Sequence, residues 1–232
     1  MPTLNASTTA YITGVSNVTF NTARTSNGSS IVNGAFGNVD PVVEYRYTSG
    51  RGGGGHRMIR TYLDFDTSGI SGTVSAATLN IASLGTNTGD IIGLKTDAFG
   101  ASGGGTLSGA SFYSTIDYTT AYTAEISTWE AGVAPKTTAN NAITLNSTAR
   151  SDMQNNARFQ IAFVNHTYDY ANSAATGTVA EGNAIAFGTN INIDYTISAA
   201  SGYANDVIGV ATANIGEVLG VATANIEKVI GV

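Results

Sequence analysis

The segment Arg60-Thr-Tyr-Leu-Asp-Phe-Asp-Thr-Ser-Gly-Ile-Ser-Gly-Thr-Val-Ser-Ala-Ala-Thr-Leu-Asn-Ile81 holds two apolar runs joined by a polar turn. In the first run Leu63 and Phe65 alternate with Tyr62, Asp64 and Asp66. A period of two is typical of a half-buried strand, so we expect Leu63 and Phe65 to face a core. Residues 66–69, Asp-Thr-Ser-Gly, then favour a turn, because short polar side chains bond their own backbone. Residues 77–81 predict a second strand.

Further short runs, rich in β-branched and aromatic residues, predict more strands. They lie at residues 11–20, 31–32, 42–48, 91–99, 142–146, 158–164, 184–187 and 191–195. Residues 21–30 read as a polar loop, and one short helix is predicted at 148–154, capped by Asn146 or Ser147. Many short strands with turn signals between them predict an all-β protein, a jelly-roll-like antiparallel β-sandwich.

The composition limits the classes of partner. Only 11% of the 232 residues are charged, against about a quarter in an average domain. Such a surface has little charge repulsion between neighbours and suits a protein packed in an assembly or facing a harsh exterior. The net charge is −6, with ten Lys and Arg spread along the chain. No basic stripe of the kind that binds nucleic acid is present, so no nucleic-acid partner is expected.

Membrane, export and thiol signals are also missing from the sequence. No apolar run approaches the roughly 20 residues of a membrane span. Residues 1–7 lack the basic segment and apolar stretch of a secretory signal. The chain has no cysteine, which excludes disulfides, thiolate metal sites and thiol catalysis. An exterior type of composition without an export signal leaves two explanations: either a signal has been removed, or the protein is released by lysis, as virion components are.

Several of these motifs together resemble a known family. They are the 60–68 run with 76–81, Thr8-Thr-Ala-Tyr-Ile12, Ser127-Thr-Trp-Glu-Ala-Gly132, Ile143-Thr-Leu-Asn146 and Ile191-Asn-Ile-Asp-Tyr195. In these motifs the chain resembles DNRLRE-type domains, which are carbohydrate-module-like jelly rolls that also occur in phage structural proteins. The resemblance spans about residues 5–198. It implies the fold and says little about function, because the shared residues are core and turn positions.

The C-terminal segment contains a repeat. Val-Ile-Gly-Val-Ala-Thr-Ala-Asn-Ile-Gly-Glu at 207–217 recurs almost unchanged at 218–228, and Val-Ile-Gly-Val follows at 229–232. We therefore divide the chain into a sandwich domain, 1–202, and a tail, 203–232. Eleven residues make three helical turns, so the period predicts a helix with one apolar stripe. The stripe contains Val207, Ala211, Ile215, Val218, Ala222, Ile226 and Val229.

Glycines at 209, 220 and 231 weaken a helix by roughly 1 kcal/mol each relative to alanine. Helical turns broken at each glycine, extended pieces added to a neighbour's sheet, and a flexible tail therefore stay open as alternatives. We interpret the repeat as an assembly element, because a near-identical apolar repeat is not typical of disorder.

Catalytic chemistry finds no support in the sequence. Asp64 and Asp66 share one face, but Asp66 opens a turn and is expected to cap backbone groups. Glu125 and Glu130 flank Trp129 without a recognisable motif. His56 and His166 lack a nucleophile elbow. We predict no catalytic residues, no cofactor and no metal ligands, although Asp169 and Asn172 leave a calcium site conceivable.

Two groups of side chains are candidates for contact with a glycan or a protein partner. The first follows the strand at 158–164 in a polar loop, where rings could stack on a sugar: Tyr168, Asp169 and Tyr170. The second lies in or beside the glycine-rich segment 49–57, which otherwise reads as a mobile loop: Arg51, His56 and Arg57.

The sequence as a whole predicts a non-enzymatic structural protein of a virion, a phage capsid decoration or fibre component. Its expected partners are further copies of itself, other virion proteins and a host surface glycan. An extracellular or cell-surface adhesin, or a carbohydrate-binding module, is the alternative.

Overall fold

A computed structural model describes residues 1–33, 42–50, 54–83, 89–127, 139–184, 191–198, 217–218 and 221–222. Its strands are β1 (Thr3–Thr13), β2 (Ser30–Asn33), β3 (Val42–Thr48), β4 (Gly55–Asp66), β5 (Val74–Ser83), β6 (Ile91–Thr96), β7 (Ile116–Ala121), β8 (Ala139–Thr144), β9 (Arg158–Asn165), β10 (Val179–Ala184), β11 (Asn192–Ile197), β12 (Glu217–Val218) and β13 (Val221–Ala222). The strand pairs of these residues are antiparallel. The all-β prediction is confirmed.

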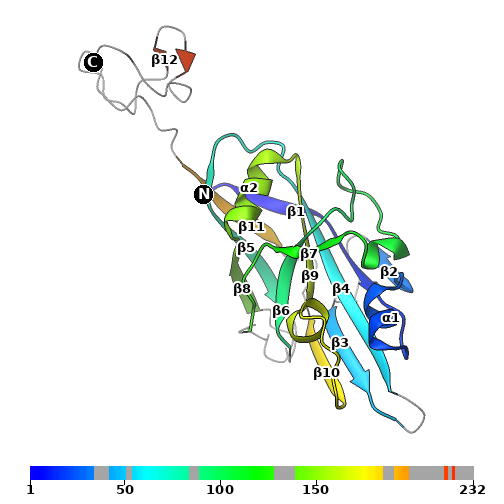
Figure 1. Cartoon of the computed structure of the whole chain (residues 1–232). Helices are drawn as coiled ribbons and strands as arrows, with labels where there is room; N and C mark the ends of the chain where they lie inside the picture. Colours follow the sequence, from blue (N-terminus) through cyan, green and yellow to red (C-terminus); the bar gives the residue numbers. More distant parts are fainter. Residues whose placement is uncertain are drawn as a thin grey trace.

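Strands β1 to β11 form one curled sheet, in the order β7-β6-β9-β4-β1-β11-β5-β8, with β3 and β10 continuing from β4, and β2 beside β1. Strand β1 joins two halves of this sheet. Residues 3–5 pair with β11, whereas residues 6–13 pair with β4, with a register shift between Ala6 and Thr8. Figure 1 shows β8, β5 and β11 together on one side of the body, with β9 and β4 on the other.

The main core lies between the two halves of the sheet. Leu63 and Phe65 of β4 belong to the same buried cluster as Leu79 of β5 and Ile193 of β11. The prediction that Leu63 and Phe65 face a core is confirmed. The turn after β4 is confirmed as well, since Asp66 Oδ1 accepts hydrogen bonds from Ser68 Oγ (2.6 Å) and Ser68 N (3.0 Å). These bonds lower the pKa of Asp66.

The opposite face of β4 is buried too, which corrects the expectation of a half-buried strand. Tyr62 and Asp64 have 0% exposed surface, and Tyr62 packs in a second core with Tyr45, Phe112 and Val164. The cover of this face comes from helical elements and their loops: α1 (Phe20–Thr25), the 3-10 turn η1 (Gly109–Phe112) and the π-helical turn η2 (His166–Tyr170). Figure 1 shows α1 against β4.

The predicted helix is confirmed as α2 (Ser147–Asn155), with Asn146 Oδ1 accepting the cap bond from Ala149 N at 3.0 Å. The prediction of a single helix is wrong, because α1 occupies part of the segment expected to be a loop. The only buried residues of α1 are Ala23 and Arg24, so the sequence has no apolar period that would predict this helix. Strand β1 begins at Thr3 and ends at Thr13, earlier than expected.

Four residues of the C-terminal repeat are described. Glu217 pairs with Ala222 and Val218 with Val221, so these residues are extended rather than helical. The other predicted assembly positions lie outside the described residues, as do Trp129 and Arg51: Val207, Ala211, Ile215, Ile226 and Val229. Within the described ranges, no helix has the length and apolar character needed to cross a lipid bilayer.

Candidate functional site

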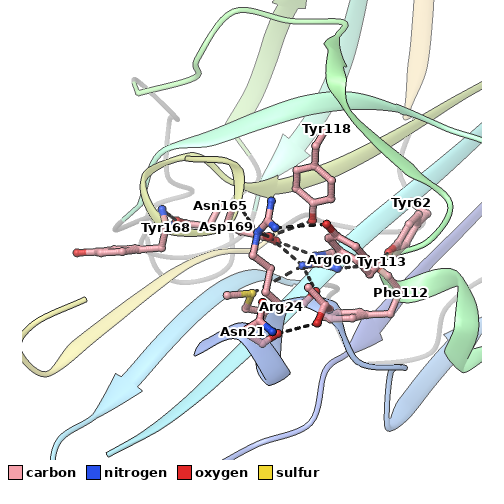
Figure 2. A network of polar contacts seen from close by, with 12 residues as sticks. Asn21, Arg24, Arg60, Tyr62, Phe112, Tyr113, Tyr118, Asn165, Tyr168 and Asp169 are labelled. Atoms are coloured by element: carbon pink, nitrogen blue, oxygen red, sulfur yellow. Dashed lines mark hydrogen bonds and ion pairs between the residues drawn. The ribbon is translucent and has the colours of Figure 1, made fainter. Parts of the chain in front are cut away.

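The second core contains a charged group at its centre. Arg60 of β4 has no exposed surface, and its guanidinium grips the carboxylate of Asp169 of η2 through two parallel hydrogen bonds (Figure 2). Arg60 Nε donates to Asp169 Oδ2 at 2.7 Å, and Nη2 donates to Oδ1 at 2.8 Å. This bidentate geometry is the strongest arrangement available to an arginine and a carboxylate.

The remaining donors of Arg60 reach the two other covering elements. Nη1 donates to the carbonyl oxygen of Phe112 in η1 at 2.5 Å, and Nη2 donates to the carbonyl oxygen of Arg24 in α1 at 2.9 Å. The Phe112 ring lies 3.9 Å from the guanidinium carbon, within the range of a cation–π contact. A single side chain of the sheet therefore holds α1, η1 and η2 in place.

A second guanidinium approaches the same carboxylate. Arg24 Nε donates to the backbone oxygen of Asp169 at 2.8 Å and lies 3.5 Å from Oδ1. Its guanidinium carbon stands 4.4 Å from the ring of Tyr118, whose hydroxyl donates to Asp169 Oδ1 at 3.0 Å. Two cations thus share one buried anion, and aromatic rings flank both cations.

The protonation states follow from burial and charge. Burial lowers the pKa of Arg60, but the charge and hydrogen bonds of Asp169, together with the neighbouring Tyr118 and Tyr62, outweigh burial, so the net shift is upward and the guanidinium stays charged. Burial raises the pKa of Tyr62 and of Tyr118, which keeps both hydroxyls neutral as donors. Tyr62 uses its proton on the carbonyl oxygen of Phe112 at 2.8 Å.

This network changes the role of the first predicted contact group. Asp169 is 1% exposed and its carboxylate is held by Arg60, Arg24 and Tyr118, so a surface role for Asp169 is wrong. Tyr168 and Tyr170 are half-buried on either side of it. Tyr168 stacks on Tyr45 with ring centroids 4.2 Å apart, and Tyr170 stacks on His166 at 5.4 Å.

In the second predicted contact group, too, the residues differ in their burial. His56 is buried, so its role as a surface contact is wrong. The Tyr45 hydroxyl accepts a bond from Ala175 N at 3.1 Å and lies 2.9 Å from His56 Nδ1, so we assign its proton to the bond to His56. Burial lowers the pKa of His56, which favours the neutral, accepting ring. Arg57 stays half-buried and pairs with Glu44 at 2.8 Å.

The two predicted groups nevertheless meet. Tyr45 stacks on Tyr168 and bonds His56, so one aromatic cluster links both. Its outer ring, Tyr47, lies 4.4 Å from the His56 ring on one side. A Cβ on Gly54 would stand 2.4 Å from the Tyr47 ring, so the Gly54 backbone lies on that ring too. One face of Tyr47 is therefore covered by His56, and its hydroxyl end lies close to the Gly54 backbone.

The open polar surface lies elsewhere, in a cleft of about 460 Å³ between the end of β6, the end of α2 and the start of β9. Lys95 Nζ donates to Asp152 Oδ2 at 2.8 Å, and the Tyr122 hydroxyl donates to the same oxygen at 2.5 Å. Burial, together with the bond to Asp152, raises the pKa of Tyr122, so this hydroxyl keeps its proton. Arg158 pairs with the buried Asp64.

The sequence contains a pattern that indicates burial of Arg60, which an analysis of alternating residues alone does not detect. Met58 and Tyr62 alternate with Ile59 and Leu63, so apolar residues occur on both faces of this strand. A run that is apolar on both faces is typical of a strand covered on both sides, and an arginine inside it requires a buried partner. For the cleft we find no local signal, because its residues come from three separate segments, 95–101, 122 and 155–160.

Neither a protein-family model nor a curated protein matches this chain. The resemblance to DNRLRE-type domains therefore stays a prediction. In the part of the chain that the structure describes, no group of three or more His, Cys, Asp or Glu side chains is placed to hold a metal ion.

Proposed function

We propose that this protein is a non-enzymatic structural component of a virion, a capsid decoration or fibre subunit that assembles through its C-terminal repeat. The body, residues 1–202, is in this proposal a jelly-roll-like sandwich. Its support is the shared core of the two sheet halves, in which Leu63 of β4 and Leu79 of β5 meet.

One observation carries the proposal. The eleven-residue repeat is apolar and nearly identical in its copies. Its four described residues, 217–218 and 221–222, do not belong to the sheet of the body. Strands β12 and β13 pair with each other in a sheet of their own. A repeat of this kind buries its apolar side chains by stacking on neighbouring copies or on a partner.

The distribution of charge gives further support. Arg24 and Arg60 are buried with their carboxylate partner Asp169, and the half-buried Arg158 is paired with Asp64, which leaves few unpaired cations on the surface of a chain with only ten Lys and Arg. A surface with so few free charges favours close packing of neighbouring subunits.

The first test is the mass in solution of the full chain and of the 1–202 fragment, measured by light scattering. We expect a defined oligomer for the full chain and a folded monomer for the fragment, with the same thermal midpoint as judged by circular dichroism. Two monomers would contradict a role of the repeat in self-assembly, and an unfolded fragment would contradict the domain division.

The second test concerns location. The full chain is mixed with virus particles purified from its source, and the mixture is sedimented through a density gradient. Co-sedimentation in stoichiometric amount, lost on removal of residues 203–232, is the expected result. Sedimentation of the chain apart from the particles would contradict a virion component.

A further inference from the structure

The cleft beside β6 continues into a second hollow. The larger part, about 460 Å³, reaches from Lys95 to Asn155 and Arg158. A hollow of about 300 Å³ shares Lys95, Thr96 and Asp97 with it and extends to Asp117. The two hollows adjoin at Lys95, Thr96 and Asp97 at the end of β6 and are here called the groove. Each falls near or within the range of roughly 300–1,000 Å³ typical of ligand sites.

Charge in this groove is balanced locally. Lys95 is paired with Asp152, and Arg158 with Asp64. The exposed carboxylate of Asp97 and the more distant Asp117 add negative charge. Anionic ligands such as phosphates or acidic sugars are therefore disfavoured by repulsion and gain no free cation.

The hydrogen-bonding groups of the groove suit a neutral ligand that both donates and accepts. The Lys95 ammonium has three N–H donors, of which Asp152 takes one. Asp97, Asn155 and Asn156 are exposed along the wall and offer carboxylate and amide groups. Hydroxyl groups match such a mixture, because each hydroxyl can donate one bond and accept two.

The wall is held in place before any ligand arrives. Gln160 Oε1 accepts from Phe99 N at 3.0 Å, and its Nε2 donates to Gly100 O at 2.7 Å, which fixes the turn after β6. Tyr122 is fixed from below by stacking on Phe159 at 4.9 Å. A rigid wall reduces the entropy that binding must overcome.

We propose that this groove binds a neutral oligosaccharide. The apolar side chains that line it are small or buried, such as Ala101 and Ala157, so it lacks the apolar pocket that anchors a peptide. The site is distinct from the aromatic cluster of Tyr45, His56 and Tyr168. The proposal does not depend on a role in a particle, since a decoration protein, a fibre and an adhesin could all carry such a groove.

The test uses the full chain, labelled with a fluorophore, on an array of neutral hexose and N-acetylhexosamine oligomers with acidic oligomers beside them. We expect the chain to bind at least one neutral series and no acidic one. In the variants Lys95→Ala and Asp97→Ala, affinity should fall about tenfold or more, as expected for the loss of a hydrogen bond to a charged group.

Arg46→Ala is the matched control. Arg46 is exposed on β3, beside the beginning of β4, where Thr48 pairs with Gly55. The groove residue Arg158 lies beside the other end of β4, where it pairs with Asp66. Arg46 is therefore far from the groove. Asp97 bonds Thr115 and Gly100 through its backbone N–H and carbonyl groups, which alanine keeps, so Asp97→Ala should keep the fold. The proposal is overturned if the array shows no neutral binding, if only acidic oligomers bind, or if Arg46→Ala weakens binding as much as Lys95→Ala and Asp97→Ala do.

Discussion

At the scale of single residues, the buried carboxylate of Asp169 is expected to be sensitive to substitution, because two guanidinium groups depend on it. It faces the guanidinium of Arg60 at 2.7 Å and that of Arg24 at 3.5 Å. Removing one member of a buried ion pair leaves an uncompensated charge, which typically costs about 3–5 kcal/mol. Without the Arg60–Asp169 pair the second core would enclose an unpaired charge, so we expect the pair to be needed for this core to close.

We therefore expect Asp169→Asn to lower the free energy of unfolding by about 3–5 kcal/mol, measured by urea denaturation. The matched control is Glu44→Gln, which removes the carboxylate of the half-buried Arg57 pair. Since ion pairs in contact with water contribute about 0–1 kcal/mol, the control should change stability little. Equal losses in the two variants would contradict a special role for the Asp169 cluster.

His56 gives a prediction for pH dependence. Its folded pKa lies below the unfolded value, which is about 6.5. The unfolded chain therefore binds more protons between these two values, and stability is lost as the pH falls from about 6.5 through the folded pKa. The measurement is the thermal midpoint between pH 8 and pH 5. On acidification over this range, the midpoint should fall less in the His56→Gln variant than in the parent.

The other histidine provides the control for this experiment. His166 is half-buried, with its Nδ1 3.2 Å from the exposed carboxylate of Glu125. His166→Gln leaves His56 and its contacts in place, so it should keep the part of the acid sensitivity that His56 supplies. If His56→Gln loses as much stability as the parent on acidification, His56 is not the group that limits acid stability.

At the scale of elements, strand β4 shows what a sequence pattern can and cannot predict. The alternation of Leu63 and Phe65 predicted the main core correctly, because a buried face leaves a regular apolar period. The burial of Tyr62 and Asp64 could not be read from that period. It depends on α1, η1 and η2, which come from separate parts of the chain.

The candidate site shows the same limit. The sequence selected Tyr168, Asp169 and His56 by residue type, and all three take part in contacts with distant residues. Their burial depends on partners such as Arg60 and Tyr45, which no local pattern brings near. Local chemistry therefore located groups that matter, but assigned them to the surface instead of the interior.

The repeat illustrates a different limit. An odd period excludes a single flat strand, whose faces would alternate from copy to copy. In the β12–β13 ladder, however, opposite residues share a face although their numbers differ by an odd amount, as Glu217 and Ala222 do. In a hairpin, positions eleven apart on the two arms therefore lie on one face, so the period is compatible with paired strands as well as with a helix.

The beginning of β4 supplies a prediction about close packing. A Cβ on Gly55 would lie 2.3 Å from Cα of Asn17, a backbone atom that cannot turn away. We expect Gly55→Ala to destabilise the protein by about 1–3 kcal/mol, as overpacking does. Gly69→Ala is the control, because nothing lies within 4 Å of its added Cβ. Denaturant midpoints compare the two, and similar midpoints would contradict the close approach of Asn17.

At the scale of the whole molecule, the sheet has a covered core on each of its faces around β4. Its strands are joined by pairings between distant parts of the chain, such as β1 with β11. The predicted fold class followed from many short local patterns. The way in which β1 passes between the two halves rests on a register shift near Ala6 and Thr8, which those patterns do not contain.

The link between Arg60 and Asp169 also has a consequence for biosynthesis. These residues are separated by 109 positions, and Arg60 and its acceptor on Phe112 by 52. A chain emerging from the ribosome exposes Arg60 long before its anion is made, and contacts between such distant positions form slowly. We therefore expect the second core to close only after translation has passed η2, so the order of synthesis sets the earliest moment at which Arg60 can be paired.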